Sequence, residues 1–170
     1  MFKSSSKFIT LIAFFCLLAS CGFHLRGNFD IPNSLRIMRI LPNQPFDPFQ
    51  RSLKKTLISN GVQVVTDEDP RAKDSAKLTL QSQLFSERNV AYGSDGQPNR
   101  ALLTFNVSYQ ISDAQGKLLI PGASVQVERE LTLNPTAYLA TDNERARLRN
   151  DLIIDAASQL ARQLSIAPVP

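Results

Sequence analysis

The chain has 170 residues, of which 43% are hydrophobic and 20% are charged. This length fits one domain with a real hydrophobic core, and 19 basic against 15 acidic residues exclude a long polybasic or polyanionic tail. The two cysteines are too few for a four-cysteine zinc site or for a framework of several disulfides.

Residues 1–20 have the pattern of a bacterial lipoprotein signal peptide. Two early lysines precede an uncharged, mostly apolar run of 12 residues over positions 8–19. A run of this length suits a signal peptide and is shorter than the roughly 20 residues of a membrane-spanning helix. It ends in Leu18-Ala19-Ser20-Cys21, which resembles a lipobox with Cys21 as the lipid-attachment residue. The alternatives are an uncleaved membrane anchor and an ordinary signal peptide followed by an incidental cysteine.

Cleavage before Cys21 removes Cys16, Lys3 and Lys7, so the formal charge falls from +4 to +2. The remaining chain, residues 21–170, is expected to form a single domain, held to the membrane by the lipid on Cys21. Gly22 follows the cysteine, in place of the aspartate by which such lipoproteins are retained at the inner membrane. By that resemblance we expect the lipoprotein to be located at the outer membrane. We expect no nucleic-acid partner for an exported protein.

The first half of this domain predicts a strand, a helix and a second strand. Residues 34–41 are β-like, and Asp47 is the expected N-cap of a helix with Gln50 at the capping-box position. The helix closes at Asn60-Gly61, and residues 62–65 form the next strand. A right-handed crossover through the helix would place the two strands parallel.

Three longer segments alternate between apolar and polar residues, which indicates an antiparallel sheet with one buried face. The expected buried positions are Leu78, Leu80, Ser82 and Leu84; then Leu103, Phe105, Val107, Tyr109 and Ile111; then Val125, Val127, Leu131 and Leu133. Residues 93–98 and 113–116 are the hairpin loops, and Gly122 marks a bend.

The capping box Thr141-Asp142-Asn143-Glu144 predicts a long helix over about residues 142–164. Its apolar stripe comprises Leu148, Leu152, Ala156, Leu160 and Leu164. Residues 165–170 are expected to be a disordered tail. The predicted fold class is therefore α+β, with two helices packed on one face of a four- to five-stranded mixed, mostly antiparallel sheet.

The sequence offers little for catalysis. His24 is the only histidine, which argues against a Ser-His-Asp triad and a histidine-based metal site. Glu128 and Glu130 share one strand face, where a solvated surface is about ten times more frequent than a catalytic pair. Asp67-Glu68-Asp69, in the charged loop 66–75, lacks the alternation and distal glutamate of a calcium loop. We expect a protein that is not an enzyme and that binds no metal and no cofactor besides the covalent lipid.

Arginines form two groups. Arg88 and Arg100 flank the loop 93–98 and should lie near one hairpin tip, while Arg145, Arg147 and Arg149 crowd the first turns of the last helix. Guanidinium groups suit phosphates, because their fork makes two charge-assisted hydrogen bonds. A solubilising surface explains these residues equally well.

The segment Cys21-Gly22-Phe23-His24-Leu25-Arg26 resembles the start of the mature chain in the LptE family of lipopolysaccharide (LPS) assembly lipoproteins. The resemblance continues through residues 57–62 and 134–144. It implies an outer-membrane lipoprotein on the periplasmic side that plugs the large LPS-transport β-barrel LptD. It further implies that the protein assists assembly of that barrel and binds LPS on its way to the cell surface. Arg88 and Arg100, with Arg145 as a helper, are then the candidates for contact with LPS phosphates.

A second class of function stays open on these residues. Another envelope lipoprotein could share such an α+β domain, for example an accessory subunit of a lipid-transport ABC system or a β-barrel assembly factor. Co-purification of a very large barrel protein separates the two classes.

Cys21→Ala is expected to leave the domain folded but mislocalised, because Cys21 precedes the first predicted strand by more than ten residues. The measurement is membrane fractionation in cells that lack the barrel, since partner binding would otherwise rescue localisation. Quantitative recovery of the unacylated variant in the outer membrane would contradict this expectation.

Overall fold

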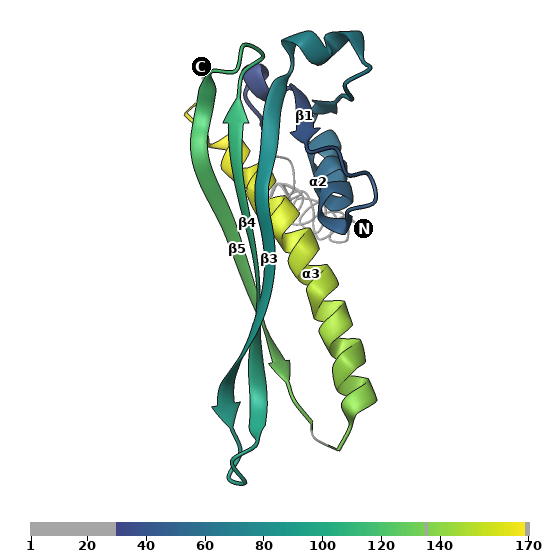
Figure 1. Ribbon diagram of the computed structural model, residues 1–170, viewed down its shortest axis with the longest axis vertical. Helices are drawn as coiled ribbons and strands as arrows, with labels where there is room; N and C mark the ends of the chain where they lie inside the picture. Colours follow the sequence, from purple (N-terminus) through teal and green to yellow (C-terminus); the bar gives the residue numbers. More distant parts are fainter. Residues whose placement is uncertain (1–29, 135, 169–170) are drawn as a thin grey trace, which may run out of the picture.

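The computed structural model describes residues 30–134 and 136–168. The elements in chain order are the 3₁₀ helix η1 (Asn33–Leu35), β1 (Ile37–Leu41), α2 (Pro48–Ser59), β2 (Gln63–Val64), the 3₁₀ helix η2 (Pro70–Asp74), β3 (Ala76–Tyr92), β4 (Pro98–Ser112), β5 (Leu118–Thr132) and α3 (Tyr138–Ser165). The domain is elongated: β3, β4 and β5 run along its long axis beside α3, while β1 and α2 lie toward one end (Figure 1).

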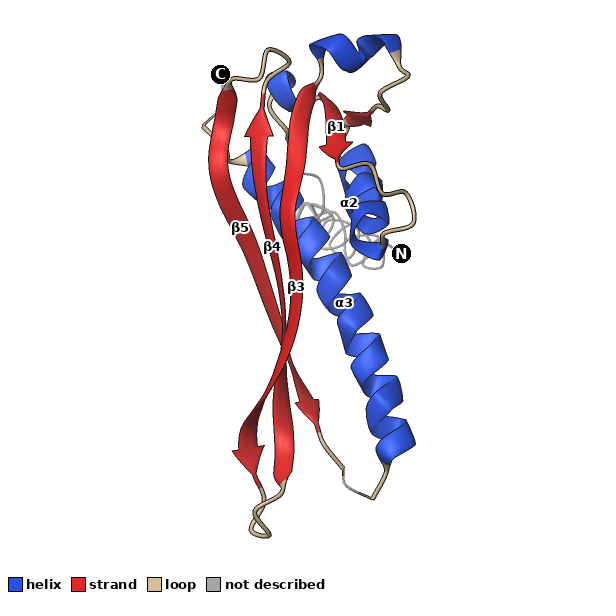
Figure 2. Cartoon of the chain, viewed as in Figure 1, coloured by secondary structure: helices blue, strands red, loops and turns tan. Residues whose placement is uncertain are grey.

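The strands form one five-stranded sheet in the order β2-β1-β3-β4-β5. β1 is parallel to β2 and β3, whereas the β3–β4 and β4–β5 pairs are antiparallel. Both helices contact the buried face of β4 and lie on the same side of the sheet (Figure 2). The predicted α+β class is therefore confirmed, and so is the parallel pairing across the first helix.

Helix α2 begins as its sequence predicts. The side chain of Asp47 accepts a 2.7 Å hydrogen bond from the backbone N–H of Gln50. The amide of Gln50 does not return to Asp47, because it bonds the preceding loop at Pro42 and Gln44 instead. At the other end, Gly61 has φ +82°, a left-handed conformation that favours glycine after a helix.

The core lies between β4 and the two helices. Phe105 is fully buried, packs edge-on against Phe49 of α2 at 5.6 Å and stacks on Phe85 of β3 at 4.1 Å between ring centroids. Tyr109 is also buried, and its hydroxyl donates a 2.8 Å hydrogen bond to Gln163 of α3. The alternation predicted for β4 and the apolar stripe predicted for the last helix are both confirmed.

The alternation predicted for β3 is wrong beyond Leu80. The register pairs Leu80 with Tyr109 but Ser82 with Ser108, so one extra residue forms a β-bulge. The bulge reverses the faces of the rest of the strand. Leu84 is 63% exposed on the outer face, and Phe85 turns toward the core in its place.

A second register shift lies in β5 opposite Tyr109 and Ile111. These residues pair with Ala123 and Ile120, which leaves Pro121 and Gly122 as the irregular step in the strand. The bend predicted at Gly122 therefore corresponds to a bulge within one continuous strand.

The predicted helix start at Thr141 is also wrong. Helix α3 begins one turn earlier at Tyr138, and Thr141 is buried within it. Its hydroxyl donates to the carbonyl of Ala137 at 3.1 Å instead of capping the helix. At the other end, Ser165 is the last helical residue and 166–168 have no helix or strand; residues 169–170 lie outside the described chain.

Phe105→Ala is expected to lower the free energy of unfolding by about 3–5 kcal/mol, because a large buried ring leaves a cavity. Asn106→Ala, on the opposite face of the same strand, should cost much less. Chemical denaturation of both variants measures the difference, and equal losses would contradict the assignment of Phe105 to the buried face and Asn106 to the outer face.

Candidate functional site

The β3–β4 hairpin brings Arg88 and Arg100 together. Its turn over residues 93–97 is closed by a 2.8 Å hydrogen bond between its end residues, and Gly96 adopts φ +75°, which favours glycine. The register then pairs Arg88 with Leu102, two residues from Arg100 along β4. Arg88 and Arg100 therefore lie close to each other near the hairpin tip, as the sequence predicts.

Both arginines lie on the sheet face that the helices leave uncovered. Arg100 directly precedes the buried Ala101 in β4, and Arg88 pairs with Leu102, whose side chain also points away from the helices. Arg100 forms an ion pair with Glu130 of β5 at 3.4 Å, and both side chains are more than half exposed. Arg88 has no ion pair among the described residues, and residues 1–29 contain no acidic side chain. Arg88 therefore keeps an uncompensated positive charge.

Arg145 lies on the other side of the sheet. From α3 its guanidinium reaches Glu87 of β3, with the closest contact at 3.1 Å, and it also bonds Asp142. The side chains of Arg145 and Glu87 are only 26% and 29% exposed. The hydrogen bond to Glu87 raises the pKa of Arg145 above its ordinary value. The structure therefore separates Arg145 from Arg88 and Arg100 and gives it two carboxylate partners.

The other arginines of α3 are also engaged. Arg147 pairs with Glu144 at 2.6 Å, and this hydrogen bond lowers the pKa of the glutamate. Arg149 lies over the ring of Phe85, 5.8 Å from its centroid, within the range of a cation–π contact. The arginine group at the start of the last helix is thus mainly structural.

Exposed apolar side chains lie at the same end of the domain, and the sequence reasoning missed them. Tyr92 ends β3 and is 61% exposed, while Tyr138 and Leu139 open α3 and are 72% and 82% exposed. A cavity of about 220 Å³ beside Tyr138 reaches Arg145. The predicted helix begins at about residue 142 and leaves these two α3 residues in a loop, so no predicted pattern singled them out. Exposed apolar groups at the same end of the domain as the hairpin arginines are the combination that an anionic amphiphile requires.

The acidic loop binds arginines. Asp67 accepts from Arg39 at 2.7 Å, and Asp69 accepts from Arg71 at 2.7 Å while also capping η2. The hydrogen bonds from Arg71 lower the pKa of Asp69 to about 2. Within residues 30–134 and 136–168, no group of three or more His, Cys, Asp and Glu side chains is arranged to hold a metal ion.

The two glutamates of β5 belong to a polar surface. Glu128 accepts hydrogen bonds from Gln126 and Thr104, and Glu130 pairs with Arg100. Both glutamates are exposed on the uncovered sheet face. Their surroundings give no feature of an acid/base pair.

Cys21, His24 and the expected signal peptide lie outside the described residues. In the described part of the chain, no helix has the length and apolar character needed to span a membrane.

Comparison with solved structures places the fold among bacterial lipoproteins. A minor lipoprotein from Acinetobacter baumannii superposes with a TM-score of 0.67 at 22% identity, covering 82% of this chain and 97% of the other. A lipoprotein B from Nitrosomonas europaea also gives 0.67 at 23% identity, over 85% and 90% of the two chains. The shared class is an α+β domain with this arrangement of sheet and helices.

Sequence comparison then gives the family. The model of the LptE family, described as lipopolysaccharide-assembly, matches residues 38–164. The LPS-assembly lipoprotein LptE of Photorhabdus laumondii is 30% identical over 165 residues, which cover 93% of this chain and 85% of the relative. The LptE protein of Yersinia pestis is 31% identical over the same share of this chain and 75% of its own length. The chain belongs to the LptE family of LPS-assembly lipoproteins.

The Arg145–Glu87 pair joins α3 to β3, so a double-mutant cycle with Arg145→Ala and Glu87→Ala should show a coupling free energy of about 0.5–1 kcal/mol. The same cycle on Arg147 and Glu144, which are more exposed and lie within one helix, should give a smaller coupling. Denaturation curves of the variants measure both. Equal coupling free energies in the two cycles would mean that the ion pair between α3 and β3 stabilises the fold no more than one within a single helix.

Proposed function

We propose that the protein is a non-catalytic outer-membrane lipoprotein, anchored through Cys21, that plugs the LPS-transport barrel LptD, assists its assembly and binds LPS. The observation that carries this proposal is the family match over residues 38–164, together with about 30% identity to LptE proteins over 93% of the chain. The lipobox-like sequence before Cys21 supports the anchor.

The uncovered face of the sheet suits the lumen of a large barrel. It consists of rows of mostly uncharged polar residues across three strands: Ser82, Ser108 and Ser124; Leu84, Asn106 and Gln126; Ser86, Thr104 and Glu128. Asn106 and Gln126 bond each other at 3.4 Å across their strands. Barrel interiors are polar and can be plugged by a folded domain. The three rows contain one charged residue, Glu128, and it accepts hydrogen bonds from Gln126 and Thr104, so contact of these rows with a polar wall buries no unpaired charge.

The hairpin end suits LPS. Arg88 and Arg100 offer guanidinium groups to phosphates, and Tyr92, Tyr138 and Leu139 offer exposed apolar surface to acyl chains. Arg145 is a weaker candidate for ligand contact than the other two, because it already holds two carboxylates.

Affinity purification of the tagged lipoprotein from outer membranes tests the partnership. The expected result is co-purification of one very large barrel protein in stoichiometric amount. Recovery of a lipid-transport ABC complex or of the barrel-assembly machinery instead would assign the chain to a different envelope role.

Arg88→Glu combined with Arg100→Glu is expected to weaken LPS binding by at least tenfold, since each charge-assisted hydrogen bond is worth about 1.5–3 kcal/mol. Melting temperature and barrel association should stay near those of the unmodified protein. Direct LPS-binding titration of the full chain in detergent is the measurement, and added salt should weaken the unmodified interaction.

The matched control is Lys73→Glu with Lys117→Glu, which changes the charge equally at two exposed positions away from the hairpin. It should leave LPS binding unchanged. If the arginine variant keeps its LPS affinity but loses the barrel, the two arginines belong to the partner interface and not to the ligand site.

A further inference from the structure

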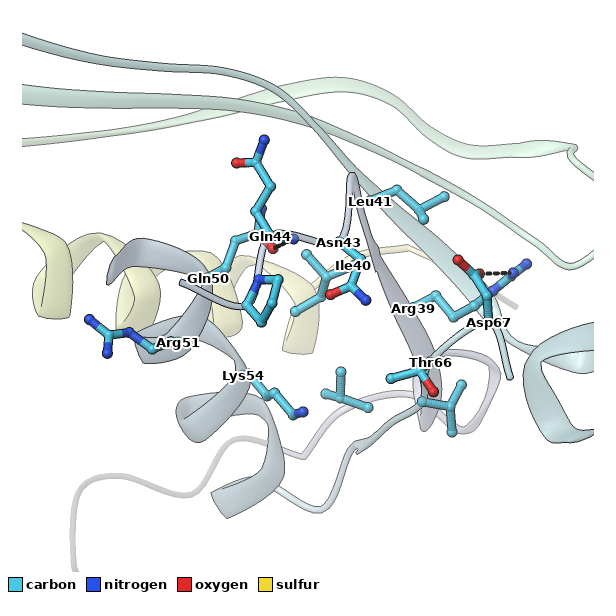
Figure 3. A pocket seen from close by; sticks show the side chains of 13 residues that line it. Arg39, Ile40, Leu41, Asn43, Gln44, Gln50, Arg51, Lys54, Thr66 and Asp67 are labelled. Atoms are coloured by element: carbon cyan, nitrogen blue, oxygen red, sulfur yellow. Dashed lines mark hydrogen bonds and ion pairs between the residues drawn. The ribbon is translucent and has the colours of Figure 1, made fainter. Parts of the chain in front are cut away.

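A second cavity lies toward the opposite end of the domain from the β3–β4 hairpin. It has a volume of about 190 Å³ and opens where the parallel strands β1 and β2 end, beside α2 (Figures 1 and 3). Ile40, Val64 and Val65 form part of its apolar wall. Because β1 and β2 are parallel, the loops that follow them meet at this edge of the sheet. The space exceeds the roughly 30 Å³ that one water molecule occupies in the liquid, so it admits a small polyatomic group.

The wall of the cavity is held in place by a buried amide. Gln50 is only 5% exposed, and its side chain donates to the carbonyl of Pro42 and accepts from the backbone N–H of Gln44, both at 3.0 Å. Asp47 fixes the backbone of Gln50 in turn, at 2.7 Å. These three bonds hold the loop between β1 and α2 against the helix, so the cavity is formed before any ligand arrives.

The charges around the cavity are unbalanced. Arg39 is satisfied by Asp67 at 2.7 Å and Ser75 at 3.0 Å. Arg51 and Lys54 have no ion pair within the described chain, and residues 1–29 contribute no carboxylate side chain. Lys54 extends from α2 toward the side of Thr66, whereas the guanidinium group of Arg51 points the other way, away from Lys54 (Figure 3). Two uncompensated cations thus border a preformed cavity.

We propose that this cavity binds a phosphate group, with Lys54 as its principal contact and Arg51 at the entrance. A phosphate monoester carries about −1.5 to −2 charges at neutral pH, which matches the two free cations. The group is either a soluble phosphate or the phosphodiester headgroup of an anionic phospholipid, which carries a single negative charge; both present non-bridging phosphate oxygens that can accept from Lys54. This site is separate from the hairpin arginines and does not depend on the role proposed for them.

Lys55 supplies a matched control, because it is exposed on the same helix, carries the same charge and does not line the cavity. The full chain in zwitterionic detergent is titrated with inorganic phosphate while the amide resonances of Gln44, Gln50 and Thr66 are followed by NMR. These resonances should shift and saturate. Lys54→Gln should raise the dissociation constant about tenfold, the effect expected for loss of one charge-assisted hydrogen bond, and Lys55→Gln should leave it unchanged.

A second arm replaces phosphate with nanodiscs that contain phosphatidylglycerol. A Lys54-dependent response to phosphate alone supports a site for soluble phosphates, and one that needs the nanodiscs supports a lipid headgroup site. The proposal is overturned if the cavity resonances do not move in either arm, or if Lys54→Gln and Lys55→Gln weaken binding equally. Equal melting temperatures of the two variants exclude a folding defect, and LPS binding through Arg88 and Arg100 stays intact whichever result is obtained.

Discussion

The buried face of β4 is the constraint on which the rest of the domain depends. Every second residue from Ala101 to Ile111 has less than 2% of its surface exposed, and this stripe requires a cover along the strand. Helix α2 has only 12 residues and contacts the middle of this stripe, through Phe49 and Phe105. Helix α3 has to cover the remainder, which explains its 28 residues, roughly 42 Å at 1.5 Å per residue.

Strand β3 extends beyond that cover. After the bulge its helix-facing positions include Phe85 and Glu87, neither of which is fully buried. Arg149 and Arg145 of α3 reach across to them through a cation–π contact and an ion pair. The stacking of Phe85 on Phe105 is thus the apolar contact of this margin, and long charged side chains of α3 supply its contacts to the helix. Exposed ion pairs and cation–π contacts are individually weak, so these links add little stability to the hairpin end.

The sequence predicted the elements whose patterns are strict and local. The alternation in β4 and the cap at Asp47 each agree with the surrounding fold, and both are confirmed. The predictions are wrong where a single local feature of the fold, a β-bulge or an earlier helix start, changes which way the following side chains point. The bulge after Leu80 places Leu84 on the outer face, and no residue type in that strand indicates a bulge. Thr141 has the sequence of an N-cap, but its burial and its bond to Ala137 place it inside the helix.

The candidate site shows the same division. The hairpin loop was enough to predict that Arg88 and Arg100 lie close together, because antiparallel register follows from the turn. It could not predict which arginines remain free. That depends on Glu87, which faces the helices only because the bulge shifts β3 by one residue. Arg145 therefore forms an ion pair with Glu87, while Arg88, the next residue along β3, lies on the polar face without a carboxylate partner.

A cationic side chain becomes a candidate ligand contact when the fold leaves its charge unpaired beside a surface that can complete the site. Arg88 meets this condition at the end of the domain that carries exposed aromatic residues, and Lys54 meets it beside a preformed cavity. Lys55, one residue away, carries the same charge and is exposed like Lys54, but it does not line that cavity. The distinction between functional and solubilising cations in this domain therefore arises from tertiary placement, and composition alone gives all of them equal weight.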